Sequence, residues 1–212
     1  MKKQFLALFA LSTLILTSCG DGDKKATDTN DTTTEVTSDN ETEGSDDSED
    51  SDSGSGNLLA DNATLVKAEK ELKELPKFKG KEIKVFQKIY FYGDGRIVVS
   101  IQDPEKAENV DQYTYQDGKW QEPEAVQISG GGSMDANTFP LSQIKFETVN
   151  SIYKQVQEKS KDVEGAEELD AAFYAMNPAT GELRWTTSVQ GTRGNYTGIF
   201  NADGSLKSFE QN

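Results

Sequence analysis

The chain has 212 residues, a net charge of −15 and no histidine, which excludes a histidine-based catalytic triad and a histidine zinc site. The charge is unevenly spread, because residues 20–57 hold thirteen acids and two lysines, whereas the part after residue 57 has a net charge of −6. That part contains about 155 residues, which is enough for one ordinary domain with a hydrophobic core. The acidity of the chain therefore belongs mainly to a segment that precedes the expected domain.

The amino terminus has a basic start at Lys2 and Lys3, followed by an apolar run from Phe5 to Leu16. The run is too short to span a bilayer as a mature helix, and it is typical of the core of a signal peptide. One interpretation is an ordinary secreted protein that is cut at a small-residue site. The residues that follow the run favour another interpretation.

The signal-like segment ends in Leu16-Thr17-Ser18-Cys19, which resembles the lipobox of bacterial lipoproteins. The resemblance implies that residues 1–18 are a signal peptide and that Cys19 receives lipid chains such as palmitate. Several chains on one cysteine anchor a protein stably, since each buried methylene adds about 0.8 kcal/mol. Cys19 is the only cysteine of the chain, so an intramolecular disulfide is impossible, and its lipidation would also exclude cysteine catalysis.

The residues after Cys19 bear on the membrane that would hold the anchor. Gly20 stands where an aspartate would retain such a lipoprotein in the inner membrane, which favours the outer membrane. Asp21 and Asp23 resemble the acidic tags that export lipoproteins to the cell surface in some Gram-negative groups. We therefore expect a lipid-anchored protein of the cell envelope that faces either the periplasm or the exterior.

Residues 19–57 are expected to form an acidic, disordered tether. After Cys19 the segment has one aliphatic residue larger than alanine, Val36, so it cannot bury enough apolar surface to offset the entropy of the chain. A charged coil of this length would hold a domain several nanometres from the lipid.

The first predicted element after the tether is a helix over residues 58–75, with Asn62 as a candidate N-cap and Pro76 directly after its end. Four strand-like runs follow at residues 83–92, 96–102, 110–115 and 119–128, with Asp-Gly pairs at two of the turns. The apolar stripe of the helix consists of Leu65, Ala68, Leu72 and Leu75.

After a break at Ser129–Gly132, the same plan recurs. A second helix is predicted over residues 142–160, with Phe146, Val149, Tyr153 and Val156 on one face. Four strand-like runs follow it at residues 169–176, 182–190, 194–200 and 205–210.

The repeated order of elements predicts an α+β fold of two tandem units, residues 58–132 and 133–212. Each unit has one helix and a four-stranded antiparallel sheet, with the helices packed on one face. In element order and turn placement this plan resembles the beta-lactamase-inhibitor-protein architecture and the related PepSY-like domains. The resemblance implies a binding or inhibitory module without a cofactor.

Strand alternation indicates which side chains would face away from the helices. In the first strand Ile83, Val85, Ile89 and Phe91 are expected to point inward. Trp120, Val126 and Ile128 are also expected in the core, as are Phe173, Leu183, Trp185 and Val189 in the second half. The predicted partner-binding residues on the open face are Lys84, Phe86, Lys88, Tyr90, Tyr92, Tyr174, Met176 and Arg184. The alternative is that these side chains only pair across strands and cover the sheet.

The sequence gives little support to catalysis. The glycines at residues 130–132 lack the lysine and the strand–helix context of a phosphate-binding loop. Two carboxylates can hydrolyse a glycosidic bond, but Glu164, Glu167, Glu168 and Asp170 cluster where a solvated loop is expected. We therefore expect no enzyme, no metal site and no cofactor.

The expected function is that of a membrane-anchored lipoprotein that presents a non-catalytic module for binding a protein or peptide, with an inhibitory role as one form of it. The alternative is a structural or accessory envelope lipoprotein that binds glycan or a membrane complex, and a carboxylate-based hydrolase is a third. We expect the membrane as a partner through Cys19, a protein or peptide as the second partner, and no nucleic acid.

Overall fold

In a computed structural model, which describes residues 56–129, 132–177 and 179–212, the chain builds one antiparallel sheet beside a layer of helices. The predicted signal peptide, the lipobox with Cys19 and nearly all of the tether lie outside the described residues.

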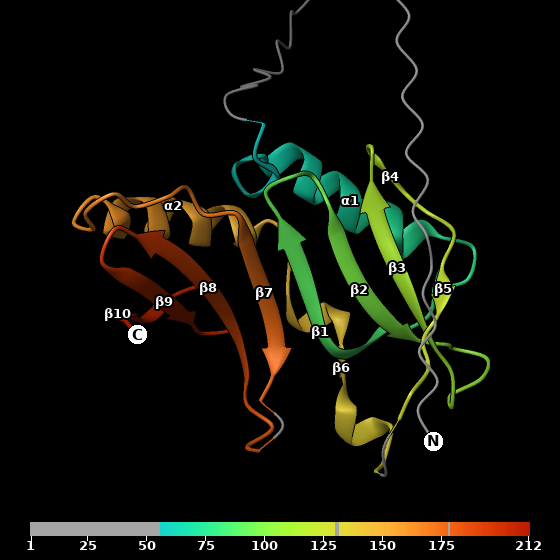
Figure 1. Cartoon of the computed structure of the whole chain (residues 1–212). Coiled ribbons are helices and arrows are strands. Elements are labelled where there is room, and N and C mark those ends of the chain that lie inside the picture. The colour runs from blue at the N-terminus through green and yellow to red at the C-terminus, as the bar shows by residue number, and fades with distance from the viewer. Residues whose placement is uncertain (1–55, 130–131, 178) are drawn as a thin grey trace, which may run out of the picture. The chain divides into compact units, whose positions relative to one another are not determined.

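The sheet has the strand order β10-β9-β8-β7-β1-β2-β3-β4, with β5 paired to β3 and β6 paired to β1 (Figure 1). Each half of the chain supplies one side of this sheet, and the two sides meet where β1 pairs with β7. The strands are β1 (Lys84–Tyr92), β2 (Ile97–Gln102), β3 (Val110–Gln116), β4 (Lys119–Trp120), β5 (Glu124–Ala125), β6 (Thr138–Pro140), β7 (Ala171–Met176), β8 (Leu183–Gly191), β9 (Gly194–Phe200) and β10 (Leu206–Gln211).

Seven of these strands lie within two residues of the predicted runs. The run predicted over residues 119–128 instead forms the two short strands β4 and β5, with Pro123 between them. Proline has no backbone N–H and cannot complete a strand ladder, so the run is interrupted there. Strand β6 was not predicted, because three residues are too few to show a period.

The helices α1 (Asn62–Glu74) and α2 (Thr148–Ser160) lie behind the sheet in the view of Figure 1, on the same face. Short 3₁₀ helices precede them: η1 (Leu58–Ala60), η2 (Asp135–Asn137) and η3 (Leu141–Gln143). The N-cap of α1 is Asp61 and not the predicted Asn62, since the Asp61 side chain accepts a hydrogen bond from the Thr64 amide. None of the helices in the described ranges is long and apolar enough to cross a membrane.

The core lies between the helices and one face of the sheet. The predicted stripe of α1 is confirmed at its three buried residues, Leu65, Ala68 and Leu72. In α2 the buried apolar residues are Val149, Ile152 and Val156. Phe91 of β1 joins the two halves, because its ring packs edge-on against Phe146 at 4.9 Å and against Trp185 of β8 at 5.7 Å.

Strand β1 changes its neighbour partway along its length. Residues 84–86 pair with β6, whereas residues 88–92 pair with β7 on the same edge. Between them Gln87 has a φ of +61°, a left-handed conformation that non-glycine residues rarely adopt. The register with β2 shifts at the same place. Gln87 therefore forms a bulge that divides β1 into two parts.

Asn57 connects the start of the described chain to its second half. Its side-chain oxygen accepts a hydrogen bond from the Leu59 amide at 2.9 Å and so caps η1. Its side-chain nitrogen donates to the Leu169 carbonyl at 2.8 Å and to the Glu168 carboxylate at 3.1 Å. One asparagine thus holds the entry to α1 against the segment that leads into β7.

Two further polar contacts join the helix layer. The side-chain nitrogen of Asn150, which is 5 % exposed in α2, donates to the Ala60 carbonyl at 2.7 Å and to the Leu59 carbonyl at 3.3 Å. The carboxylate of Glu69 in α1 accepts a hydrogen bond from the Phe146 amide at 2.7 Å. Both contacts cross from the first half of the chain to the second.

We predict that Asn150→Ala lowers the free energy of unfolding by about 1–3 kcal/mol, because it leaves two η1 carbonyls without their buried donor. The measurement is urea denaturation of the full chain. Asn195→Ala, at an exposed position in β9, is the matched control and should change stability by about 0.5 kcal/mol or less. Equal stability of the two variants would show that Asn150 does not join the halves.

Candidate functional site: the uncovered face of the sheet

The face of the sheet turned away from α1 and α2 carries the candidate site. In β1 the side chains of Val85, Ile89 and Phe91 are buried against the helix layer, as predicted. The alternate residues, including Tyr90 and Tyr92, are partly exposed on the other face. The helix layer covers one face only, so this second face is open to solvent where the structure describes it. We call it the uncovered face.

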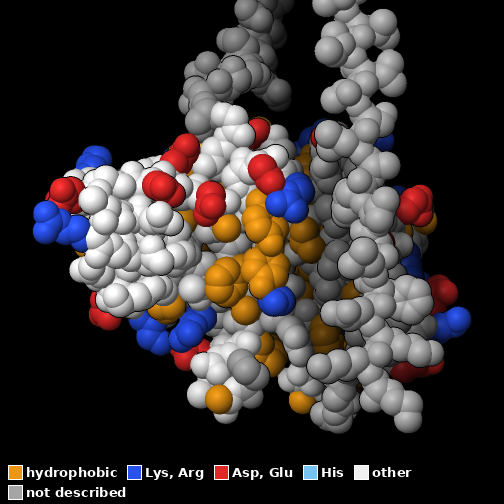
Figure 2. Space-filling model, viewed as in Figure 1, with side chains coloured by type: hydrophobic (Ala, Val, Ile, Leu, Met, Phe, Trp, Pro, Cys, Tyr) orange, Lys and Arg blue, Asp and Glu red, His pale blue; other side chains and the backbone are white. Residues whose placement is uncertain are grey.

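A row of side chains, all but one of them apolar, crosses the middle of the uncovered face from strand to strand. Tyr90 lies opposite Val98 of β2 on one side and opposite Phe173 of β7 on the other. Phe173 in turn lies opposite Thr186 of β8, and Thr186 opposite Ile199 of β9. Hydrophobic side chains gather at this place in Figure 2. The five residues, which we call the cross-strand row, span five adjacent strands.

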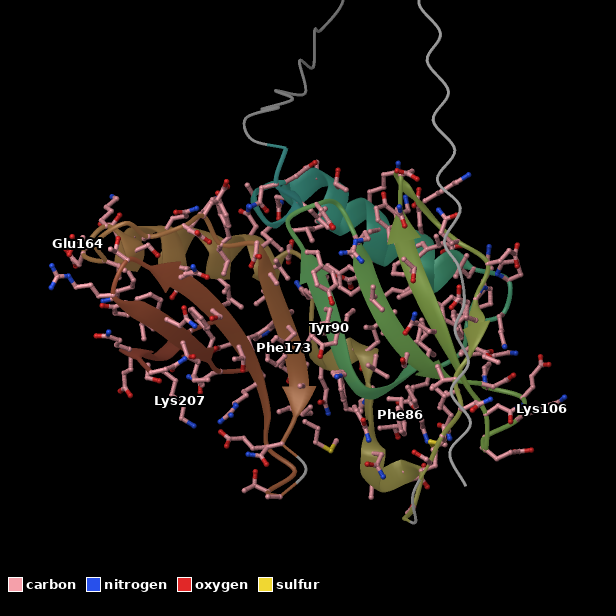
Figure 3. The ribbon with its side chains drawn as sticks, viewed as in Figure 1. Phe86, Tyr90, Lys106, Glu164, Phe173 and Lys207 are labelled. Carbon is pink, nitrogen blue, oxygen red and sulfur yellow. The ribbon has the colours of Figure 1, made fainter. Side chains whose placement is uncertain are left out.

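Aromatic rings form the centre of this row. The centroid of Tyr90 lies 5.4 Å from that of Phe173 and 5.8 Å from that of Tyr92, with which it stacks. Such pairs are worth about 0.5–1.5 kcal/mol beyond the area that they bury. Figure 3 shows Tyr90 and Phe173 side by side on neighbouring strands, with Phe86 farther along β1. The rings are thus held in fixed positions at an exposed surface.

Two cations lie over these rings. The ammonium of Lys88 is 4.8 Å from the centre of the Tyr90 ring, and the guanidinium of Arg96 is 4.6 Å from the centre of the Tyr92 ring. Aromatic rings with arginine are enriched at protein–protein interfaces, where they contribute most of the binding energy. The arrangement can therefore bind a partner through apolar and charged contacts together.

Three cations around the margin of the face pair with carboxylates. Lys84 lies 3.2 Å from Asp135, Arg96 lies 2.8 Å from Asp94, and Lys207 lies 2.9 Å from Glu182. The hydrogen bond from Lys207 lowers the pKa of Glu182.

The predicted directions of three side chains in β7, those of Phe173, Tyr174 and Met176, are wrong. Tyr174 is 1 % exposed and packs against Phe139 and Trp185, at centroid distances of 5.4 and 5.0 Å, and burial raises its pKa. Met176, two residues on, also packs against the core. Phe173, which was expected in the core, lies on the uncovered face instead. The reason is that β7 reads AAFYAM, without an apolar–polar alternation, so only its register with β1 determines which way each residue points.

Among the other residues that were assigned to the core or to the open face, some assignments are correct and others are wrong. The core assignment of Ile128 is wrong, because its side chain is 42 % exposed beyond β5. Trp120 packs against the core, and its indole nitrogen donates to the Ala68 carbonyl at 2.9 Å. The predicted partner-binding residues that lie in the open-facing positions of their strands are Lys84, Phe86, Lys88, Tyr90, Tyr92 and Arg184. Phe173, Val98, Thr186 and Ile199 complete the surface and were missed.

The acidic residues between α2 and β7 form an ion pair and hydrogen bonds with other parts of the fold. Glu164 pairs with Arg193 at 2.9 Å, and Glu168 accepts hydrogen bonds from Tyr153 and Asn57. Among the described residues, no group of three or more acids or cysteines is placed to hold a metal ion.

Comparisons with protein-family models, with curated proteins and with solved structures find no match for this chain.

We predict that Tyr174→Ala and Phe173→Ala differ sharply in stability, although the residues are adjacent. Tyr174→Ala empties part of the core and should lower the free energy of unfolding by about 3–5 kcal/mol. Phe173→Ala removes only a surface pair and should cost about 1 kcal/mol or less. Urea denaturation of the full chain measures both. A larger loss for Phe173→Ala would contradict the assignment of the two faces.

Proposed function

We propose that this chain is a lipid-anchored envelope protein that displays a non-catalytic binding surface for a protein or peptide. The observation that carries the proposal is the cross-strand row on the uncovered face. Its rings are ordered by their neighbours before any partner binds, so little side-chain entropy remains to be lost on binding. Interfaces of proteins are built around such aromatic centres with charged residues nearby.

The proposed anchor is lipid on Cys19, and the proposed location is the outer membrane. The support comes from the sequence, in which a signal-like segment ends in the lipobox-like Leu16-Thr17-Ser18-Cys19. The acidic residues 20–57 would then act as the tether between the lipid and the sheet.

We also propose that residues 58–132 and 133–212 are two copies of one helix-plus-four-strand unit, as in the beta-lactamase-inhibitor-protein and PepSY-like plan. The order of the sheet supports this, because the first long strand of each half, β1 or β7, lies at the centre. The later strands of each half follow outward in chain order. Duplication would explain why both helices lie on one face.

For the anchor, we predict that the native protein lacks residues 1–18 and carries lipid on Cys19. Cys19→Ser should abolish the lipid mass and remove the protein from the membrane fraction. Intact-mass spectrometry and cell fractionation measure the two effects. Ser55→Ala, which changes a residue of the tether, is the control and should leave both unchanged. A native protein with a free Cys19 thiol would contradict the anchor and leave the surface proposal standing.

For the surface, we predict that a photo-crosslinking amino acid at position 173 captures a discrete partner in cells that produce the protein. The same amino acid at position 154, on the exposed side of α2, is the control and should capture none. Gel analysis after irradiation reads out the adduct. Capture at both positions, or at position 154 alone, would contradict a binding role for the uncovered face.

A further inference from the structure

We infer that the partner presents a carboxylate beside an apolar side chain, and that Lys88 and Arg184 bind this carboxylate over Ala175. This inference depends on the proposed role of the uncovered face and adds the chemistry of the partner to it.

The three residues lie in one line across three strands. Lys88 of β1 is opposite Ala175 of β7, and Ala175 is opposite Arg184 of β8. Neighbouring strands are about 4.8 Å apart, so the backbones of the two cations are separated by about 10 Å. The residue between them has only a methyl group. Two long basic side chains thus flank a short one, and an anionic group placed over Ala175 would lie between them.

The charges of these two residues are available to a partner. Lys84, Arg96 and Lys207 each pair with a carboxylate, whereas neither Lys88 nor Arg184 forms a salt bridge within the described ranges. The ammonium of Lys88 lies over the Tyr90 ring, and the charge of Arg184 helps to lower the pKa of Glu182 without forming a salt bridge with it in the described ranges. A carboxylate placed between the two cations would form charge-assisted hydrogen bonds, which are the strong ones.

The position of the cross-strand row indicates where the apolar side chain of the partner would bind. In each of the three strands, a residue of the cross-strand row lies two positions from a residue of the proposed carboxylate site, and therefore on the same face. The pairs are Lys88 and Tyr90, Ala175 and Phe173, and Arg184 and Thr186. Two residues of a strand span about 6.7 Å. The same distance separates residues i and i+2 of an extended peptide, whose side chains point to one side. A segment with Asp or Glu two positions from an apolar residue therefore fits both subsites at once.

The test is selection of a random 12-residue peptide display library on the full chain. The expected result is enrichment of Asp or Glu two positions from a large apolar residue. A selected peptide should bind at least about tenfold more weakly to Lys88→Glu and to Arg184→Glu, because each variant removes one charge-assisted contact. Lys154→Glu makes the same charge change on α2 and should leave the affinity unchanged. Selection on the Arg184→Glu variant should favour Lys or Arg in place of the acid.

The outcomes separate the two proposals. Peptides that depend on Phe173 but not on Lys88 or Arg184 would overturn the carboxylate site and keep the binding face. Peptides without an acid, or with the same acid on Arg184→Glu, would also overturn the carboxylate site. If Phe173→Ala has no effect on any selected peptide, or if no motif is enriched, the binding face and the carboxylate site both fail.

Discussion

The pairing of β1 with β7 is the contact from which the rest of the described structure follows. It joins the two halves of the chain into one sheet and brings the aromatic ring of Phe91 against Phe146, which precedes α2, and against Trp185 of β8. Both helices then cover the same face, and among the described residues no helix covers the opposite face. The same pairing places Phe173 beside Tyr90, so the proposed site exists only because the halves are joined in this register.

The sequence predicts most of the strands, because the turns and the alternation of β1 are clear. It also predicts two helices, but α2 begins at Thr148 and not at residue 142. It fails where alternation is lost. Strand β7 has apolar residues at all six positions, so the directions of Phe173 and Tyr174 come only from the pairing with β1. It also fails for short elements such as β6, whose three residues show no period.

The candidate site could be predicted only in part for a related reason. The β1 residues Lys88, Tyr90 and Tyr92 are close in the sequence, and their common face follows from the period of two. The residues that complete the site come from three other strands, and only the register of the sheet brings Ala175 and Arg184 level with Lys88. The net charge of −6 after residue 57 gives no sign of two cations on one face that form no salt bridge with the described residues, because many acids pair with other lysines.

The left-handed bulge at Gln87 has a mechanical consequence. A strand that changes partner halfway does not have to separate as one cooperative unit, because each part is held by a different set of backbone hydrogen bonds. On this edge, a loss of the β6 pairing at residues 84–86 therefore breaks none of the backbone hydrogen bonds that β7 makes with residues 88–92, while β2 pairs with both parts. The edge that carries the aromatic centre is thus completed by β7 alone, and β6 serves only the first residues of the strand.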